Sequence, residues 1–482
     1  MAGLNSSQDE YDIIASKTSD PNIDTTLQTT LRPAAAIPLV IGAVIRSTNT
    51  TGCLNDYKGD REDEPQECSF AVWSYGNAIV LDAILYAAEF VPSKPTVEHV
   101  SFVNARLSSW LDMPHSAAWN LTHNVTMPWP QAVGDTIGLY PFAYLSAATY
   151  ASRAGIISSN ATDLQIASTT AGEYILGWPV HFRDGIITRL DEVKGVPECW
   201  KSGPKQPPSH DNGSCVWADD STMGLTLLAR MVSAGVVASG PSGDVNNMRR
   251  VLSAQHSLFV KHLRDAAGEG LYWHGADASL QVHSCCKWGR ANGWLMTAHV
   301  EVLNALDKAT VDFATVLAVF QSHARAVANA QSLDGRWHQV LTNTSSWLET
   351  SSTAMFAHTI AVGGARRLAT ASRIRTSTKQ GVERLGKSDH TRWSLSGQSD
   401  YRNATCTIFQ PRLRTIHTIY VAAGAGKVHG VCPGTGIQNT PEQYETRDPA
   451  ARGAVDGGYW RSGPGLGSVI RAAVSIARYE KR

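Results

Sequence analysis

Hydrophobic residues recur at helical spacing along most of this 482-residue chain, whereas the strict alternation of a β-strand is scarce. Val97, Val100, Val103, Leu107 and Leu111 fall on one face of an amphipathic helix. Other apolar runs begin directly after glycine-, proline- or polar-rich stretches, which is typical of helix starts. Predicted starts lie near Trp73, Asp135, Asp219, Asn292, Glu349 and Pro464, and further helical patterns cover 27–46, 97–111, 162–176, 244–263 and 311–330.

The two sets of helices alternate along the chain, and a helix pair recurs about every 60–85 residues. This alternation predicts an all-α fold, an (α/α)6 barrel of six helical hairpins. The inner helices of such a barrel run parallel, so their N-termini meet at one mouth. We expect residues 25–482 to form this barrel as a single domain and residues 1–24 to form a flexible N-terminal segment.

One interval between helix starts is too long for the repeat. It runs from Glu349 to Pro464, and its middle part, 372–418, is rich in Arg, Lys, Ser and Thr and has little periodicity. One outer helix is therefore hard to place. We expect an exposed, irregular insertion at about 372–418, and a translated intron is the alternative explanation.

The composition is that of an ordinary soluble globular protein, with 43% hydrophobic and 17% charged residues. The 42 basic and 42 acidic residues balance, which argues against a nucleic-acid partner because such partners favour a basic surface. No stretch reaches the roughly 18–20 apolar residues that a membrane-spanning helix needs. We therefore expect no nucleic-acid partner and no membrane partner, and we further expect a monomer.

Glycosylation signals are frequent. Their number exceeds chance and favours a secreted, N-glycosylated protein, although no standard signal peptide is evident in this chain. Eight cysteines fit an oxidising compartment, and Cys53 with Cys68 and Cys199 with Cys215 are close enough in sequence to close loops. The Asn-x-Ser/Thr sequons begin at Asn5, Asn49, Asn120, Asn124, Asn160, Asn212, Asn343 and Asn403.

Two adjacent acids, Asp219 and Asp220, follow Trp217 at a predicted helix start. Aspartate is a preferred N-cap, so one of the two is expected to cap the helix. A neighbouring carboxylate and an indole wall can also raise the pKa of an aspartate, as a catalytic acid requires. Asp135 lies at another helix start, where it is either a cap or a partner of the doublet across the barrel mouth.

An unusual string, Trp288-Gly-Arg-Ala-Asn-Gly-Trp294, precedes another predicted helix. Arg290 can bind a carboxylate through a bidentate fork, and the two indoles can stack on it or on a sugar. Gly289 and Gly293 allow a tight turn or the close approach of a ligand to the backbone. The alternative is a structural arginine within an aromatic cluster.

Two further stretches place polar groups just before predicted helices. Gly270-Leu-Tyr-Trp-His274-Gly predicts a loop that presents His274, either as a site residue or as a structural histidine. Glu349 is better explained as an acid of the first helical turn than as a catalyst.

The chain contains no HExxH or CxxC pattern and no specific phosphate-binding loop, so we expect neither a metal nor a cofactor.

Together these strings resemble the unsaturated rhamnogalacturonyl and glucuronyl hydrolases of glycoside hydrolase families 105 and 88, and family 105 most closely. They occur in family order over nearly the whole chain. The strings begin at Trp73 (Trp-Ser-Tyr-Gly), Gly134 (Gly-Asp), Trp217 (Trp-Ala-Asp-Asp), Gly270, Trp288, Asp334 (Asp-Gly-Arg-Trp-His-Gln-Val), Leu348 (Leu-Glu-Thr-Ser) and Gly430 (Gly-Val-Cys-Pro-Gly-Thr-Gly).

The resemblance implies an (α/α)6 barrel that removes a 4,5-unsaturated uronic acid from the non-reducing end of oligosaccharides left by polysaccharide lyases. It implies that Asp219 is the catalytic acid, which hydrates the C4=C5 double bond, and that Asp135 is the second aspartate of the family. The implied substrate-binding positions are Tyr75, Trp217, His274, Trp288, Arg290 and Trp294.

Two other functions fit the same residues. An inverting glycosidase for saturated glycans would use Asp135 and Asp219 as base and acid with a water between them. A carbohydrate-binding barrel without activity is the non-enzymatic reading, although the presence of both aspartates speaks against it. The substrate discriminates between the enzymes, because hydration requires a double bond.

Overall fold

The computed structural model describes thirteen parts of the chain, most of them helical. They are residues 33–47, 75–91, 95–111, 141–153, 161–177, 185–187, 215–237, 244–268, 270–277, 282–333, 335–365, 441 and 463–480. The predicted flexible segment 1–24, the predicted insertion at 372–418 and the candidate catalytic residue Asp135 lie outside the described residues.

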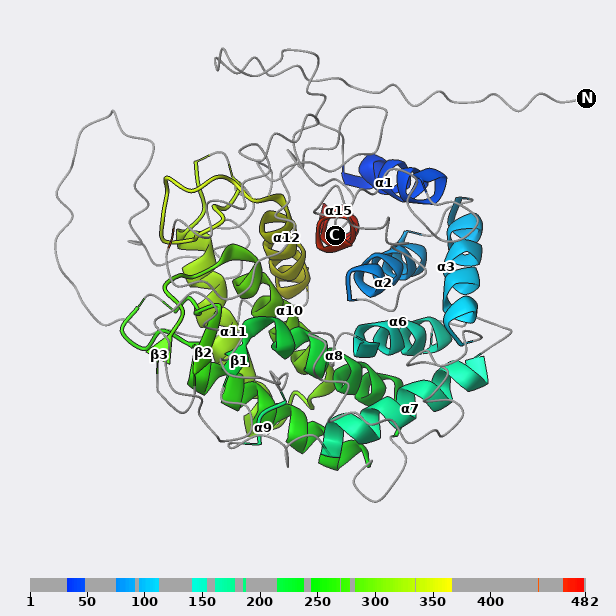
Figure 1. Cartoon of the computed structure of the whole chain (residues 1–482), viewed down its shortest axis with the longest axis horizontal. Coiled ribbons are helices and arrows are strands. Elements are labelled where there is room, and N and C mark those ends of the chain that lie inside the picture. The colour runs from blue at the N-terminus through cyan, green and yellow to red at the C-terminus, as the bar shows by residue number, and fades with distance from the viewer. Residues whose placement is uncertain are drawn as a thin grey trace, which may run out of the picture.

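Six helices form the inner layer and pack side by side in a closed ring (Figure 1). Each packs against the next in chain order, and the last packs against the first. The inner helices are α2 (Tyr75–Phe90), α6 (Pro141–Arg153), α8 (Ala218–Ala234), α10 (Gly289–Ala305), α12 (Thr350–Ala365) and α15 (Gly463–Glu480).

The outer helices cover this ring. In the described residues, α3 lies on α2, α7 on α6, α9 on α8, α11 on α10, and α1 on α15. This alternation of outer and inner helices is the (α/α)6 barrel that the helical pattern predicts. The outer helices are α1 (Pro33–Ser47), α3 (Pro95–Leu111), α7 (Ala161–Gly177), α9 (Val245–Leu263) and α11 (Val311–Asn329).

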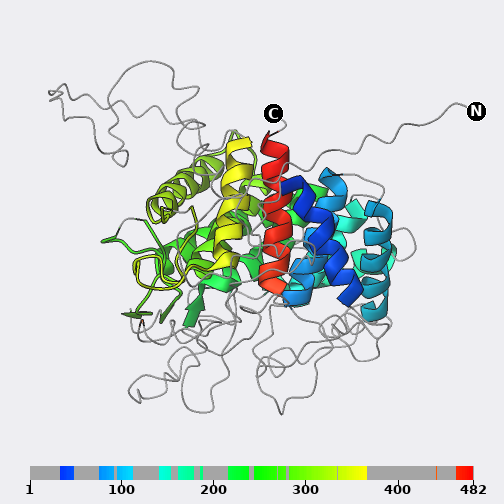
Figure 2. The same ribbon diagram turned by 90° about the horizontal axis from the view of Figure 1, so that it is seen from above.

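The inner helices run in the same direction. The Thr222 hydroxyl, near the start of α8, donates to the Trp294 carbonyl near the start of α10, at 2.6 Å. At the other end, the hydroxyls of Tyr86 and Ser475 lie 3.1 Å apart, late in α2 and α15. In Figure 2 the carboxyl end of α15 points one way and the strands lie toward the opposite end of the helices. The first turns of the inner helices therefore share one end of the barrel.

Helix boundaries agree with most predicted starts, with two shifts. Helix α1 begins at Pro33, later than the start of the predicted range 27–46. Helix α6 begins at Pro141, later than the start predicted near Asp135. Proline suits the first helical position because it has no N–H to donate and its φ is already helical. Pro141 therefore suits the first position of α6.

A small antiparallel sheet, which the sequence pattern did not predict, lies beside the starts of α8 and α10. Its strands are β1 (Cys215–Trp217), β2 (Gly275–Asp277) and β3 (Val282–His283), in the order β1-β2-β3. Strands of two or three residues are too short to show alternation.

Within the described parts of the chain, no helix is long and apolar enough to cross a membrane.

A buried ion network joins the inner helices inside the barrel. Asp82 of α2 pairs with Arg230 of α8 and with Arg471 of α15, and Arg230 also reaches Glu301 of α10 at 3.0 Å. Burial alone would raise the pKa of Asp82, but the two guanidinium charges outweigh it and hold that pKa below its usual value. Two positive and two negative charges therefore balance in the interior.

Buried histidines join the outer layer to the ring. His256 of α9, His299 of α10 and His323 of α11 lie in one line of ring contacts, and none is exposed by more than 2%. Burial lowers the pKa of His256 to about 4 and that of His323 to about 3, the latter helped by the charge of Arg264. Burial also holds the pKa of His299 well below its usual value. All three rings are thus neutral near pH 7.

We predict that acidification destabilises the barrel through these rings. Their pKa values are lower in the folded protein than the ordinary 6.5, so between the two values the unfolded chain binds more protons. The free energy of unfolding should fall as pH drops below about 6.5, by roughly 1 kcal/mol per pH unit for each histidine. Urea unfolding at several pH values measures it. The slope should be shallower in His323→Gln, and an unchanged slope would contradict the explanation.

Candidate active site

Helix α8 begins where β1 ends, and this junction places the two acids. Trp217 is the N-cap, its backbone is extended, and its side chain makes no capping hydrogen bond. The Ala218 N–H donates to the His274 carbonyl at 3.0 Å, so pairing with the neighbouring strand decides where the helix starts. The expectation that Asp219 or Asp220 caps the helix was wrong. Both lie within the first turn.

Asp219 faces the imidazole of His274, which in turn contacts an indole. Its Oδ2 lies 3.4 Å from Nε2 of His274, and its side chain is 13% exposed, whereas Asp220 is fully buried. The rings of Trp217 and His274 meet edge to face, with centroids 5.5 Å apart. The structure therefore brings together three residues that the sequence analysis singled out separately: Trp217, Asp219 and His274.

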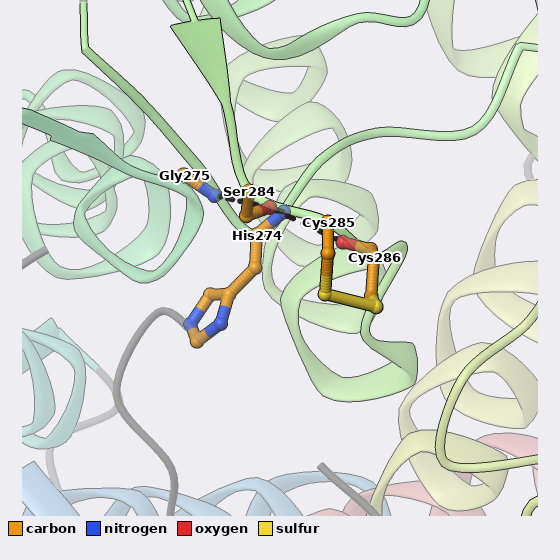
Figure 3. The surroundings of a disulfide bond; sticks show 5 residues. All are labelled: His274, Gly275, Ser284, Cys285 and Cys286. Carbon is orange, nitrogen blue, oxygen red and sulfur yellow. Dashed lines mark hydrogen bonds between the residues drawn. A yellow bond between two sulfur atoms is a disulfide. The ribbon is translucent and has the colours of Figure 1, made fainter. Parts of the chain in front are cut away.

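The backbone of His274 is held by a turn that contains a disulfide (Figure 3). The Ser284 hydroxyl accepts from the N–H of His274 at 3.1 Å and donates to the carbonyl of Cys286 at 3.2 Å. Cys286 is bonded to its neighbour Cys285. The ring of His274 points away from the disulfide, which leaves it directed toward Asp219.

The sequence analysis did not predict this vicinal disulfide, because it paired only cysteines that are separated by a loop. Of the cysteines that it paired, Cys215 lies in β1, while Cys53, Cys68 and Cys199 lie outside the described residues. Those two pairs stay predictions.

Trp288 and Arg290 form the next part of the site. Trp288 is the N-cap of α10, and its ring centroid lies 4.5 Å from that of His274. The guanidinium carbon of Arg290 lies 5.0 Å from the Trp288 ring centroid, and Arg290 is 1% exposed. Arg290 is thus stacked on an aromatic ring inside the protein, at the same mouth as Asp219.

Glu349 caps helix α12. Its carboxylate accepts from the N–H of Ser351 at 3.1 Å and from the N–H of Ser352 at 2.6 Å. The side chain is fully buried, and its Oε1 lies 4.0 Å from Nη2 of Arg290. Glu349 was expected in the first turn of this helix; the structure places it just ahead of that turn, as a cap.

The two glycines of the Trp288–Trp294 string serve helix packing. A Cβ on Gly289 would come within 2.9 Å of the Ser352 hydroxyl, and one on Gly293 within 2.9 Å of the Met355 sulfur. They therefore let α10 approach α12 closely. Neither has a positive φ, so the expected tight turn is absent at both of these described positions.

Trp294 lines a cavity enclosed by the six inner helices. The cavity has a volume of about 60 Å³, and every inner helix contributes to its wall. Space of this size holds a few waters or a small polar group. Representative lining residues, one from each inner helix in chain order, are Asp82, Ser146, Thr226, Trp294, Met355 and Arg471.

Two candidates cannot be placed from the structure. Asp135 lies outside the described residues, and Tyr75 begins α2 but its side chain is not described. A residue that the sequence analysis passed over is Asn292, whose amide binds the backbones of Tyr272 and Trp288. The sequence does show that Asn292 lies four residues after Trp288 at a predicted helix start, a spacing at which a side chain can bind the earlier carbonyl.

The described mouth therefore combines a partly exposed carboxylate with a buried imidazole, two buried indoles and a buried guanidinium. A carboxylate next to aromatic walls can give and take a proton, and a guanidinium can bind an acidic group. Within the described residues, no group of three or more His, Cys, Asp or Glu side chains is arranged to hold a metal ion.

Comparison of the fold with solved structures gives clear matches. A possible member of glycoside hydrolase family 105 from Klebsiella pneumoniae has a TM-score of 0.61 and 14% identity, covering 92% of this chain and 93% of that one. A similar possible member from Salmonella enterica has a TM-score of 0.61 and 15% identity, covering 97% and 99%. At such low identity the likeness establishes the fold alone.

Sequence comparison adds the family. The unsaturated rhamnogalacturonyl hydrolase YesR of Bacillus subtilis is 30% identical over 95 residues, which are 20% of this chain and only 28% of that relative. The family model described as Glycosyl Hydrolase Family 88 matches residues 160–404. This range covers slightly more than half of the chain and includes Trp217, Asp219, His274, Trp288 and Arg290. The chain belongs to glycosyl hydrolase family 88.

Proposed function

We propose that this enzyme removes a 4,5-unsaturated uronic acid from the non-reducing end of lyase-generated oligosaccharides, with Asp219 as its general acid. The observation that carries the proposal is the position of Asp219. It is the second residue of α8, its Oδ2 lies 3.4 Å from Nε2 of His274, and it lies at the mouth where α8, α10 and α12 begin. Membership of family 88 supports the same reaction class.

In the proposed reaction, Asp219 gives its proton to C4 of the vinyl ether, and a water molecule adds at C5. The Asp219 carboxylate then accepts the proton that this water releases, so the acid is regenerated. The hemiketal formed at C5 opens to a ketone. C1 becomes an aldehyde as the aglycone leaves with the glycosidic oxygen. One water is consumed in each turnover.

The neighbouring residues suit such a substrate. Trp217, His274 and Trp288 provide flat walls against which a half-chair sugar ring can lie. Arg290 offers a planar fork for the uronate carboxylate. Nη2 of Arg290 also lies 4.0 Å from Oε1 of Glu349. Asp135 and Tyr75 stay proposals from the family resemblance, in which Asp135 orients the water or a sugar hydroxyl.

We also propose which polymer the oligosaccharides come from. Rhamnogalacturonan-type pectin fragments are favoured by the partial likeness to YesR, together with the closer resemblance of the sequence strings to family 105. A panel of lyase-made disaccharides, each followed by the loss of ultraviolet absorbance of its double bond, tests both the reaction and the preference. Activity confined to saturated glycans would instead indicate an inverting glycosidase.

We predict that Asp219→Asn abolishes most of the turnover and leaves the fold intact. An amide cannot supply the proton, and general acid–base groups contribute about 10²–10⁴-fold. Steady-state rates on the best disaccharide of the panel measure the loss, alongside the thermal unfolding temperature. Asp312→Asn is the matched control, because Asp312 also lies in a first helical turn but is exposed on α11. Near wild-type turnover in Asp219→Asn contradicts the assignment.

We further predict that Arg290→Lys weakens catalysis on unsaturated uronides by about tenfold or more. An ammonium cannot reproduce the bidentate fork or the stacking on Trp288. The kcat/KM value and the unfolding temperature are measured together, with Arg250→Lys on the exposed face of α9 as control. A variant that loses stability but keeps its activity per folded molecule would show that Arg290 is purely structural.

We also propose that the protein is secreted and N-glycosylated. The eight sequons and the disulfide at Cys285–Cys286 support an oxidising compartment. Asn343 is the sequon that falls within the described residues. Its side chain is half-buried, but Thr342, Thr344 and Ser345 around it are exposed.

A glycan at Asn343 is the expected outcome in a eukaryotic secretory host. Peptide mass spectrometry before and after enzymatic deglycosylation detects it, and Asn343→Gln should remove one glycan. A secreted protein whose Asn343 peptide is entirely unmodified would refute the prediction for this site.

A further inference from the structure

A chain of three buried histidines ends at the active site. Nε2 of His256 lies 2.8 Å from Nδ1 of His299, and Nε2 of His299 lies 3.1 Å from Nδ1 of His323. Nε2 of His323 lies 3.0 Å from Oδ1 of Asn292. The chain starts on α9, crosses α10, reaches α11 and returns to α10.

Asn292 determines the direction of every hydrogen bond in this chain. Its Nδ2 donates to the carbonyls of Tyr272 at 3.0 Å and Trp288 at 2.9 Å, which can only accept. Its Oδ1 accepts from the N–H of Tyr272 at 2.9 Å, which can only donate. The amide orientation is therefore set by backbone groups, and Oδ1 must be the atom that faces His323.

The tautomers of the rings follow from this. Because Oδ1 of Asn292 can only accept, Nε2 of His323 carries a proton and its Nδ1 accepts. His299 then donates from Nε2 and accepts at Nδ1, where it receives the Nε2 proton of His256. A neutral imidazole has one donor and one acceptor, so three neutral rings satisfy the chain without a charge. Burial favours this neutral state.

Asn292 in turn holds two sides of the site together. It binds Tyr272, which lies two residues before His274, and the carbonyl of Trp288 at the cap of α10. The rings of His274 and Trp288 lie 4.5 Å apart, and His274 faces Asp219. A rotation of the Asn292 amide would break bonds to both segments at once.

We propose that His323 is a positioning residue of the active site, which acts through Asn292 to keep His274 and Trp288 beside Asp219. His256 and His299 complete the proton order that makes His323 a donor. The inference rests on the proposed function only where activity is the readout. Misplacement of site groups by about 1 Å can cost on the order of 10²-fold in rate.

Two matched variants test the proposal. His323→Gln can keep an N–H near the Nε2 position and so still donate to Asn292, whereas His323→Asn has a shorter side chain that loses this donor. We expect kcat/KM on an unsaturated disaccharide to fall about tenfold or more in His323→Asn and by no more than about threefold in His323→Gln. Equal stability losses in the two variants with full activity per folded molecule would overturn it.

A second measurement does not depend on activity or on the folding of a variant. Histidine-selective ¹⁵N NMR of the wild-type protein near pH 7 should show the Nε2–H tautomer at all three rings. A Nδ1–H tautomer at His323 overturns the proposal. If the wild-type protein has no activity on the whole disaccharide panel, the proposed function fails.

In that case the near-ultraviolet circular dichroism of the tryptophans still tests whether His323 positions the site. The spectrum should change in His323→Asn and stay as in the wild type in His323→Gln.

Discussion

Six parallel helices that close into a ring bring their first turns to one end of the barrel, and the candidate site depends on this closure. Asp219 lies in the first turn of α8, Arg290 in the first turn of α10, and Glu349 at the cap of α12. These residues are far apart in sequence. A change in ring order or helix direction would separate the carboxylate from the guanidinium, whatever their local sequence.

The interior of the ring contains several buried polar and charged side chains. Burying such a side chain lowers the stability of the fold unless it has a hydrogen-bonding or charged partner. Asp82 binds two arginines that come from α8 and α15, so the charges match across helices distant in sequence. Replacing buried ion pairs with apolar residues is often neutral for stability. What such pairs can supply is register, because a helix shifted by one turn would leave a buried charge unpaired. The histidine chain does the same between the layers without any charge.

The sequence predicted the helices well, because an amphipathic helix shows its buried face in its periodicity. Helices α9 and α11 begin and end within one residue of the predicted ranges 244–263 and 311–330. The sequence predicted the cap of α8 poorly, since the β1–β2 pairing that determines it joins segments about 60 residues apart. The roles of Gly289, Gly293 and Asn292 depend on neighbours in three dimensions, which periodicity cannot show. Asp135 and Tyr75 remain predictions from the family strings.

Proton transfer to carbon is the step that separates the proposed reaction from ordinary glycoside hydrolysis. Turnover of an unsaturated disaccharide in D₂O, followed from the earliest times by NMR, tests it most directly. If Asp219 protonates C4, the released product carries one deuterium on C4 and has lost the C4=C5 double bond. A released sugar that keeps its double bond and has no deuterium at C4 would show that water attacks the anomeric carbon instead.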